Sequence, residues 1–300
     1  MTEHNIMSRL EKSMIAAFLS GQTSRVFWIN GCQQAQTITR MDISAPMLMF
    51  PIIGQKRIIA DRQTYGTQAG EVLLLPKGIR CDVENIPEAG QSRFLGASLV
   101  FDRQTLGLFD KAYSDRLKDW DLTPKWKAVG SNEVYSLIAD WITHDQNYPA
   151  DLTQARHRLV EILLILARQG LAGNLLSSHS ETLSERITSH FKTDLSRDWS
   201  VKDLTKTLAM SERTLRRRLQ SERTGFRELL EDTRLNQGVE RVISSDMPIG
   251  QIAFECGYQS QSRFAERFRL RFSMSPTELR ATQKRPIADL VSLDRHRARN

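Results

Sequence analysis

The strongest constraint on the fold is a row of phenylalanines near the C-terminus, in GYQSQSRFAERFRLRFSMSP, residues 257–276. Phe264, Phe268 and Phe272 recur every four residues, so in a helix they lie on one face and pack against other helices. A second row, of arginines, keeps the same step one position earlier. The segment is therefore predicted to be a helix with a buried apolar face and a basic flank.

The residues before this helix predict a partner for it. Pro248 suits a helix start, Gly257 suits a tight turn, and Ser260 can cap the next helix. This is a helix-turn-helix pattern, whose second helix enters the DNA major groove. The predicted base contacts are Gln261, Ser262, Ala265 and Glu266. The predicted contacts to the DNA backbone are Arg263, Arg267 and Arg271.

A similar unit precedes it, in WSVKDLTKTLAMSERTLRRRLQSERTGF, residues 199–226. The apolar positions Val201, Leu204, Leu208, Leu215 and Leu219 define the inner faces of its two helices. The pair Ala209–Met210 is the expected turn, Ser211 the expected cap, and Gly225 the expected left-handed end of the helix. The residues predicted to face DNA are Arg213, Arg216 and Arg217.

The segment between the two units is predicted to be mostly one helix. About 18 helical residues span roughly 27 Å, which is close to the ~34 Å between successive major-groove faces of a duplex. One chain could thus contact two consecutive grooves.

These features resemble the DNA-binding domain of the AraC/XylS family of bacterial transcription regulators, from Ser184 to about Ala281. The matching positions are Ile252, Ala253, Gly257, Tyr258, Ser260, Ser262, Phe264, Phe268, Phe272, Ser275, Pro276 and Arg280. The resemblance implies a seven-helix domain, sequence-specific promoter binding, and base contacts by the three arginines of the first unit. Departures from the family pattern are Ser273 in place of Gly, Gly238 in place of Ala, and Glu266 at a position that is often basic or polar; Gly238 should cost about 1 kcal/mol of helix propensity.

The charge distribution agrees with a polyanion partner at the C-terminal end. Of the net +7, residues 181–300 carry +6, with 23 Lys and Arg against 17 Asp and Glu. Three separated cysteines favour neither a disulfide framework nor a zinc site. With no long apolar run and no secretory signal at the N-terminus, the chain is predicted to be cytoplasmic and to have no membrane partner.

The N-terminal half has a different pattern. Short apolar runs broken by glycines at 43–101 predict a β-sandwich or small barrel, and helical spacing follows from about residue 131. The helix with Leu159, Ile162, Leu163 and Leu166 on one face could cover the sheet or form a dimer seam. The predicted fold class is α+β multidomain: a cupin-like barrel domain with following helices (1–172), a linker (173–184), an all-α AraC-type domain with two helix-turn-helix units (185–283) and a basic tail (284–300).

The N-terminal half bears a weaker resemblance to the cupin-like domain that binds effectors and mediates dimerisation in this family. All six histidines lie outside the predicted strands, so neither a metal site nor a cofactor is expected. An arginine directed into an apolar barrel would suit an anionic effector, namely a carboxylate, a fatty acid or a cyclic dinucleotide. The candidates are Arg57, Arg80 and Arg93; strand alternation means that Lys56 and Arg57 cannot both face inward.

The predicted function is a dimeric transcription regulator that binds double-stranded promoter DNA, works with RNA polymerase and responds to a small effector. Two alternatives stay open: control by a protein partner, and a cupin-type enzyme tethered to DNA. The chain contains no GxSxG, GxxxxGK[ST], HExxH or GxGxxG motif, so no catalytic residue is assigned and a non-enzyme is predicted.

Overall fold

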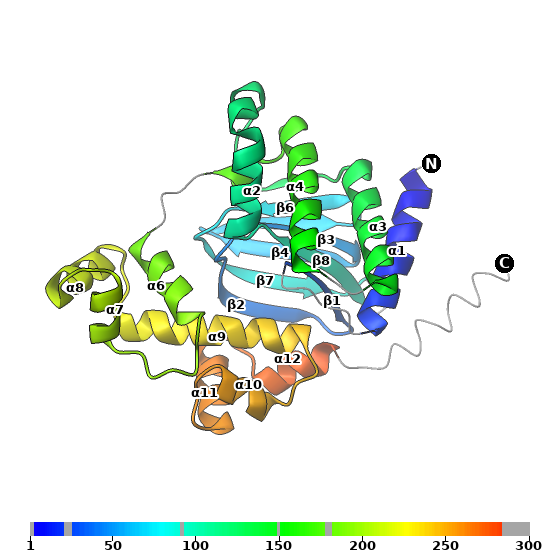
Figure 1. Ribbon diagram of the computed structural model, residues 1–300. Helices are drawn as coiled ribbons and strands as arrows, with labels where there is room; N and C mark the ends of the chain where they lie inside the picture. Colours follow the sequence, from blue (N-terminus) through cyan, green and yellow to red (C-terminus); the bar gives the residue numbers. More distant parts are fainter. Residues whose placement is uncertain (1–2, 21–25, 91–92, 149–150, 178–181, 284–300) are drawn as a thin grey trace.

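The structure is a computed structural model, and it describes residues 3–20, 26–90, 93–148, 151–177 and 182–283. Its N-terminal domain is a pair of β-sheets covered by helices, and its C-terminal domain is helical (Figure 1). The predicted α+β two-domain fold is confirmed. The predicted basic tail, 284–300, lies outside the described residues.

The N-terminal domain contains two antiparallel sheets. One has the strand order β1-β8-β3-β6-β9 and the other the order β2-β7-β4-β5. The strands are β1 (Phe27–Cys32), β2 (Gln36–Asp42), β3 (Met47–Ile53), β4 (Gln55–Ala60), β5 (Gln63–Gln68), β6 (Glu71–Leu75), β7 (Arg80–Ile86), β8 (Phe94–Val100) and β9 (Lys127–Val129). Side chains alternate between the two faces of each strand, so each sheet presents one face to the barrel interior.

Helices cover the outer face of the five-stranded sheet (Figure 1). They are α1 (Glu3–Leu19), α2 (Arg103–Tyr113), α3 (Asn132–Asn147), α4 (Leu152–Arg168) and the short α5 (Gly173–Leu176), with a 3-10 turn at Ser114–Asp119. The apolar face of α4, including Leu159 and Leu163, is buried in this core. The apolar face of α4 therefore covers the sheet, which is the first of the two roles predicted for it.

Both ends of the range predicted to be a linker, 173–184, are helical in the structure. Its first residues form α5, where the Asn174 side chain donates a hydrogen bond to the Leu74 carbonyl oxygen at 2.9 Å. Its last residues cap and begin α6, with Thr182 as the N-cap. The Asn174 amide also donates to the Lys125 carbonyl oxygen at 2.9 Å, and Leu175 is part of the N-terminal core, so α5 packs with the N-terminal domain.

The C-terminal domain has the seven helices that the resemblance implies. They are α6 (Leu183–Phe191), α7 (Val201–Thr207), α8 (Glu212–Ser221), α9 (Phe226–Ser244), α10 (Ile249–Glu255), α11 (Gln261–Phe272) and α12 (Pro276–Gln283). One apolar core lies around α6–α8 and another around α10–α12, and residues of α9 contribute to both. The predicted connecting helix is confirmed: α9 has 19 residues, about 27 Å of helix.

The two predicted turns are present, and both use left-handed backbone, at Ala209 (φ 50°) and Gly257 (φ 81°). Ser273 ends α11 in the same conformation, with φ 60°. Gly225 was wrongly predicted to be a left-handed helix end, since it is the extended N-cap of α9 with φ −138°. The left-handed residue is Arg223, with φ 57°, because α8 ends before the turn that leads into α9.

Gly238 lies in the middle of α9, where it packs against the second helix-turn-helix unit. Its helix propensity alone predicts that alanine would gain about 1 kcal/mol. However, a Cβ at this position would lie 2.8 Å from the Phe264 ring, which is fully buried. Gly238→Ala is therefore expected to lower the free energy of unfolding by about 1–3 kcal/mol, measured by urea denaturation. A more stable variant would show that the ring can move away at little cost.

Candidate nucleic-acid interface and effector domain

The first candidate recognition helix, α8, is positioned by a cap and two leucines. Ser211 accepts a hydrogen bond from the Thr214 amide at 3.2 Å, and Leu215 and Leu219 are buried. Arg213, Arg216 and Arg217 are exposed. None of the three forms an ion pair or side-chain hydrogen bond within the described part of the chain, so all are available to an external anion.

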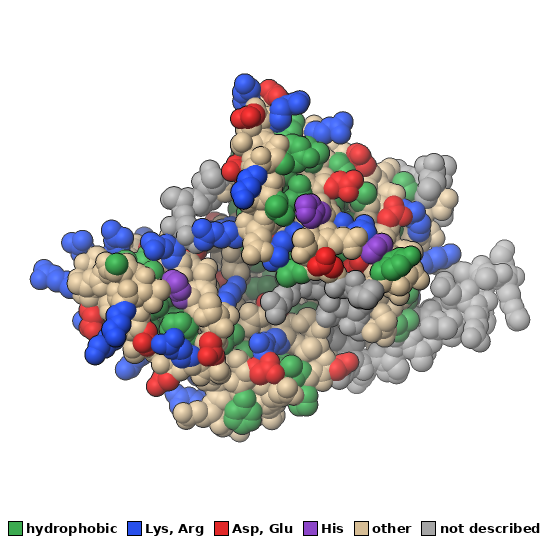
Figure 2. All heavy atoms as spheres, in the orientation of Figure 1, with side chains coloured by type: hydrophobic (Ala, Val, Ile, Leu, Met, Phe, Trp, Pro, Cys, Tyr) green, Lys and Arg blue, Asp and Glu red, His purple; other side chains and the backbone are tan. Residues whose placement is uncertain are grey.

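Basic side chains gather on the surface at the end of the molecule where α8 lies (Figure 2). A groove of about 920 Å³ lies beside this helix. Its lining includes Arg216 and Gln220 of α8 together with Arg223 and Arg227 from the turn and the start of α9. A groove with several arginines suits the phosphate backbone of a nucleic acid.

The second candidate recognition helix, α11, is anchored by the phenylalanine row. Phe264, Phe268 and Phe272 are buried, with ring centroids 5.4 and 4.8 Å apart along the row. Ser260 caps the helix by accepting a hydrogen bond from the Arg263 amide at 3.3 Å.

The residues of α11 that were predicted to contact bases lie at its N-terminal end. Gln261, Ser262 and Glu266 are exposed at its first turns, and Ala265 is half-buried between them. All four residues therefore lie at the N-terminal end of α11, on its solvent-facing side.

The arginine row of α11 separates into three different environments. Arg263 is exposed, whereas Arg267 pairs with Glu231 of α9. The hydrogen bonds that Arg267 donates to the Glu231 carboxylate raise the pKa of Arg267 above its ordinary value. Arg271 was wrongly predicted to contact the DNA backbone, because it is 6% exposed and points toward the N-terminal domain.

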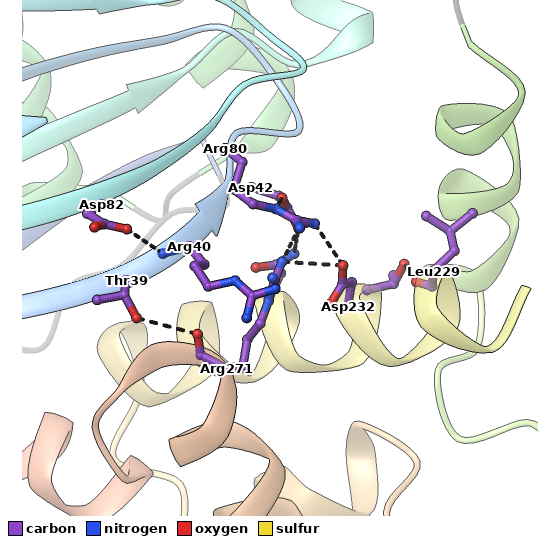
Figure 3. A network of polar contacts seen from close by, with 10 residues as sticks. Thr39, Arg40, Asp42, Arg80, Asp82, Leu229, Asp232 and Arg271 are labelled. Atoms are coloured by element: carbon purple, nitrogen blue, oxygen red, sulfur yellow. Dashed lines mark hydrogen bonds and ion pairs between the residues drawn. The ribbon is translucent and has the colours of Figure 1, made fainter. Parts of the chain in front are cut away.

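Arg271 belongs to an ion cluster that joins the two domains, formed by Asp42, Arg80, Asp232 and Arg271 (Figure 3). Arg80 Nε donates to Asp42 Oδ1 at 2.6 Å and Arg80 Nη2 to Asp232 Oδ2 at 2.9 Å. Arg271 Nη2 donates to Asp42 Oδ2 at 2.7 Å. Asp42 and Arg80 come from the barrel, Asp232 from α9 and Arg271 from α11.

Burial of the cluster changes its electrostatics. Desolvation, together with the neighbouring Asp42, raises the pKa of Asp232 despite its two arginine partners. Desolvation likewise lowers the pKa of Arg271. Four charges of alternating sign in a partly dry interface fix the relative position of the domains by geometry more than by net energy.

The three arginines predicted to bind an effector do not face the barrel interior, and this prediction is corrected. Arg57 is exposed on β4, 3.8 Å from Glu84. Arg80 lies in the interdomain ion cluster, and Arg93 lies 3.8 Å from Glu11 of α1. All three are held at the outside of the sheets because their partners are there.

The inward cation of β4 is Lys56, which is 1% exposed. Its Nζ donates to Asn85 Oδ1 at 2.6 Å and lies 5.4 Å from the centroid of the Phe94 ring. Burial lowers the pKa of Lys56 to about 8 and raises those of the nearby Cys32 and Cys81 thiols to about 12. The two thiols are therefore neutral at pH 7, while the ammonium stays largely charged.

Among the described residues, no three or more His, Cys, Asp and Glu side chains are grouped so as to hold a metal ion. Within the same residues, no helix has the length and apolar character needed to cross a membrane.

Residues 204–282 match a protein-family model described as "Helix-turn-helix domain". The HTH-type transcriptional activator FapR of Escherichia coli is 38% identical over 103 residues, covering 34% of this chain and 40% of FapR. The urease operon transcriptional activator of Escherichia coli is 28% identical over 127 residues, covering 42% of this chain and 43% of that protein. The matches thus span about two fifths of these relatives' own length.

The fold extends the likeness to both domains. The structure of unsaturated fatty acid bound ToxT from Vibrio cholerae aligns with a TM-score of 0.63 at 16% identity, over 88% of this chain and 98% of ToxT. The C-terminal domain is therefore an AraC/XylS-type helix-turn-helix domain, and the recognition made from the sequence is confirmed. The whole chain has the two-domain fold of ToxT.

Proposed function

We propose that this protein is a sequence-specific transcription regulator whose promoter binding is controlled by a small, anionic effector in the N-terminal barrel. The observation that carries the proposal is the pair of capped helices α8 and α11, which α9 joins and which both expose polar or basic side chains. The relatives named above are transcription activators, which supports the same conclusion.

The base contacts are assigned to Arg213, Arg216 and Arg217 in α8 and to Gln261, Ser262, Ala265 and Glu266 in α11. Arg forms two hydrogen bonds with guanine, Gln does so with adenine, and Glu accepts from cytosine. Arg263 and Arg267 are assigned to phosphates, and Arg267 must leave or share Glu231 to reach one.

The effector is assigned from two supports. The ToxT structure named above holds an unsaturated fatty acid, and the barrel of this chain buries one ammonium. A ligand alters DNA binding only if its affinity differs between two states of the protein, and the ion cluster between the domains provides a contact that differs between docked and released states.

RNA polymerase and a second copy of this chain complete the proposed partners. The protein is proposed to act as a regulator without an enzymatic activity. In the alternative, a protein partner controls DNA binding through the same interdomain contact. That alternative predicts that none of the small anions tested changes DNA binding.

The proposal is tested by selecting DNA from a random library with the full-length protein, followed by hydroxyl-radical footprinting. We expect enriched sequences protected at two adjacent major grooves, about one helical turn apart on one side of the duplex. Protection of a single groove would remove the assigned role of α11. If no sequence were enriched over input, the regulator proposal would be wrong.

A further inference from the structure

Among the residues that the structure describes, the barrel interior contains a positive charge without a counter-charge. Of the described residues, only Lys56 and Arg271 are buried cations, and Arg271 has Asp42 and Asp232 as partners. Lys56 has instead an amide oxygen, an aromatic face and two neutral thiols around it. Burying an ammonium without an anion is costly, so such a group persists where a ligand supplies the missing charge.

The amide that Lys56 contacts begins a hydrogen-bonded chain that leaves the barrel. Asn85 Nδ2 donates to Gln36 Oε1 at 2.6 Å, and Gln36 Nε2 donates to Thr282 Oγ1 at 2.8 Å. Asn85 and Gln36 are buried in β7 and β2, whereas Thr282 is in α12 of the DNA-binding domain. The backbone amide of Gln33 also donates to the Thr282 carbonyl oxygen at 3.3 Å. The ammonium is thus connected to the other domain through two side chains.

We propose that Lys56 binds the effector through a single carboxylate on an apolar body, and that Asn85, Gln36 and Thr282 transmit this binding to the DNA-binding domain. This inference rests on the proposed function and names its ligand class and route. It differs from the sequence prediction, which assigned the anion to Arg57, Arg80 and Arg93.

The charge of the site selects a carboxylate. One ammonium is neutralised by one negative charge, whereas a phosphate monoester brings −1.5 to −2 at pH 7 and would leave charge uncompensated in the interior. Apolar side chains also line the interior, including Ile58 on the same face of β4 and Met47 and Met49 on β3, next to the buried polar residues Asn30, Thr67 and Ser98. Unbranched methionines can rearrange around an apolar ligand body.

The geometry also gives the consequence of binding. A carboxylate oxygen is a stronger acceptor for an ammonium than an amide oxygen, and in the proposed route Lys56 Nζ turns toward the ligand and gives up its hydrogen bond to Asn85 Oδ1. Asn85 then loses the partner that orients it, and its hydrogen bond to Gln36 is lost or redirected. The contact of Gln36 with α12 changes in turn, which alters the docking of the DNA-binding domain.

The ligand class is tested by isothermal titration calorimetry of the full-length protein with benzoate and linear alkanoates of increasing length, each paired with its alcohol. We expect at least one acid to bind with a stoichiometry of one, and its alcohol to bind at least about 10-fold more weakly. Lys56→Met should weaken the acid by about 10- to 100-fold. Arg57→Met, the next residue on the same strand but exposed, is the matched control and should bind as the wild type does.

Equal binding by wild type and Lys56→Met would overturn the site, as would failure of every acid to bind up to its solubility limit.

The route is tested with Thr282→Val, which removes the hydroxyl that accepts from Gln36. This variant should keep the affinity for the acid but lose the acid's effect on binding to the selected DNA. If the acid changes DNA binding by Thr282→Val as much as it changes DNA binding by wild type, the proposed route is wrong. If the wild type binds no DNA, the regulator proposal fails, and calorimetry with the acids still tests the Lys56 site.

Discussion

Replacing Arg216 and Arg217 together by alanine is expected to weaken binding to selected DNA by about 30- to 1,000-fold. Both side chains are exposed on α8 and have no partner within the described residues, so the folded domain should lose contacts to DNA without losing internal ones. The measurement is fluorescence anisotropy at several salt concentrations. Each phosphate contact removed should lower the slope of log K against log salt by about 0.9, and each base contact removed should instead relax sequence preference.

The matched control is a second double variant, Arg57→Ala with Arg116→Ala. It removes the same charge from exposed positions of the N-terminal domain. A loss of affinity specific to the α8 variant assigns the effect to local contacts and not to net charge. Unchanged affinity together with an unchanged salt slope would remove α8 from the DNA interface.

The sequence predicted the C-terminal domain well because its signals are local. The four-residue spacing of Phe264, Phe268 and Phe272 defines a buried face, and Ser211 and Ser260 are caps whose hydrogen bonds lie within one turn. Signals of this kind depend on neighbours in the chain, so the tertiary structure did not override them.

The sequence failed where a distant segment decides the environment. Arg271 continues the four-residue spacing of Arg263 and Arg267, yet it forms an ion pair with Asp42 of β2 in the other domain. For Gly238, helix propensity predicts that alanine would be more stable, but the Phe264 ring packs against this position and leaves no room for a Cβ. In β4, Ile58 and Ile59 are adjacent and both apolar, so the sequence does not show which alternate residues face the interior. The pairing of the strands shows that Lys56 lies on the same buried face as Ile58 and Ala60.

The second large effect concerns the pH dependence of stability, compared between wild type and Lys56→Met. Burial lowers the pKa of Lys56 from 10.5 to about 8. Between these values the unfolded chain retains a proton that the folded protein has lost, so the Lys56 contribution to stability rises as pH increases from about 8 to 10.5. Below pH 8 both states hold the proton, and the full burial cost, about 3 kcal/mol, is present.

At pH 7, Lys56→Met should therefore raise the free energy of unfolding by about 0–2 kcal/mol. The variant avoids the burial cost of about 3 kcal/mol but leaves the buried Asn85 oxygen without a donor, which costs about 1–3 kcal/mol. As the pH approaches 10.5 the wild type loses the same burial cost, and its neutral amine still donates to Asn85. The stability difference should then change sign, so that the wild type becomes the more stable protein.

Urea denaturation followed by tryptophan fluorescence measures this difference, because Trp28, Trp120, Trp126 and Trp141 all lie in the N-terminal domain. The Cys32 and Cys81 thiols, whose pKa values are raised to about 12, lower stability as pH rises above about 9. They do so in both proteins, so subtracting one curve from the other leaves the contribution of Lys56 together with its electrostatic coupling to the two thiols. Arg57→Met should run parallel to wild type. If Lys56→Met also runs parallel, the ammonium already has a counter-charge in the folded protein, and a ligand is not needed to supply one.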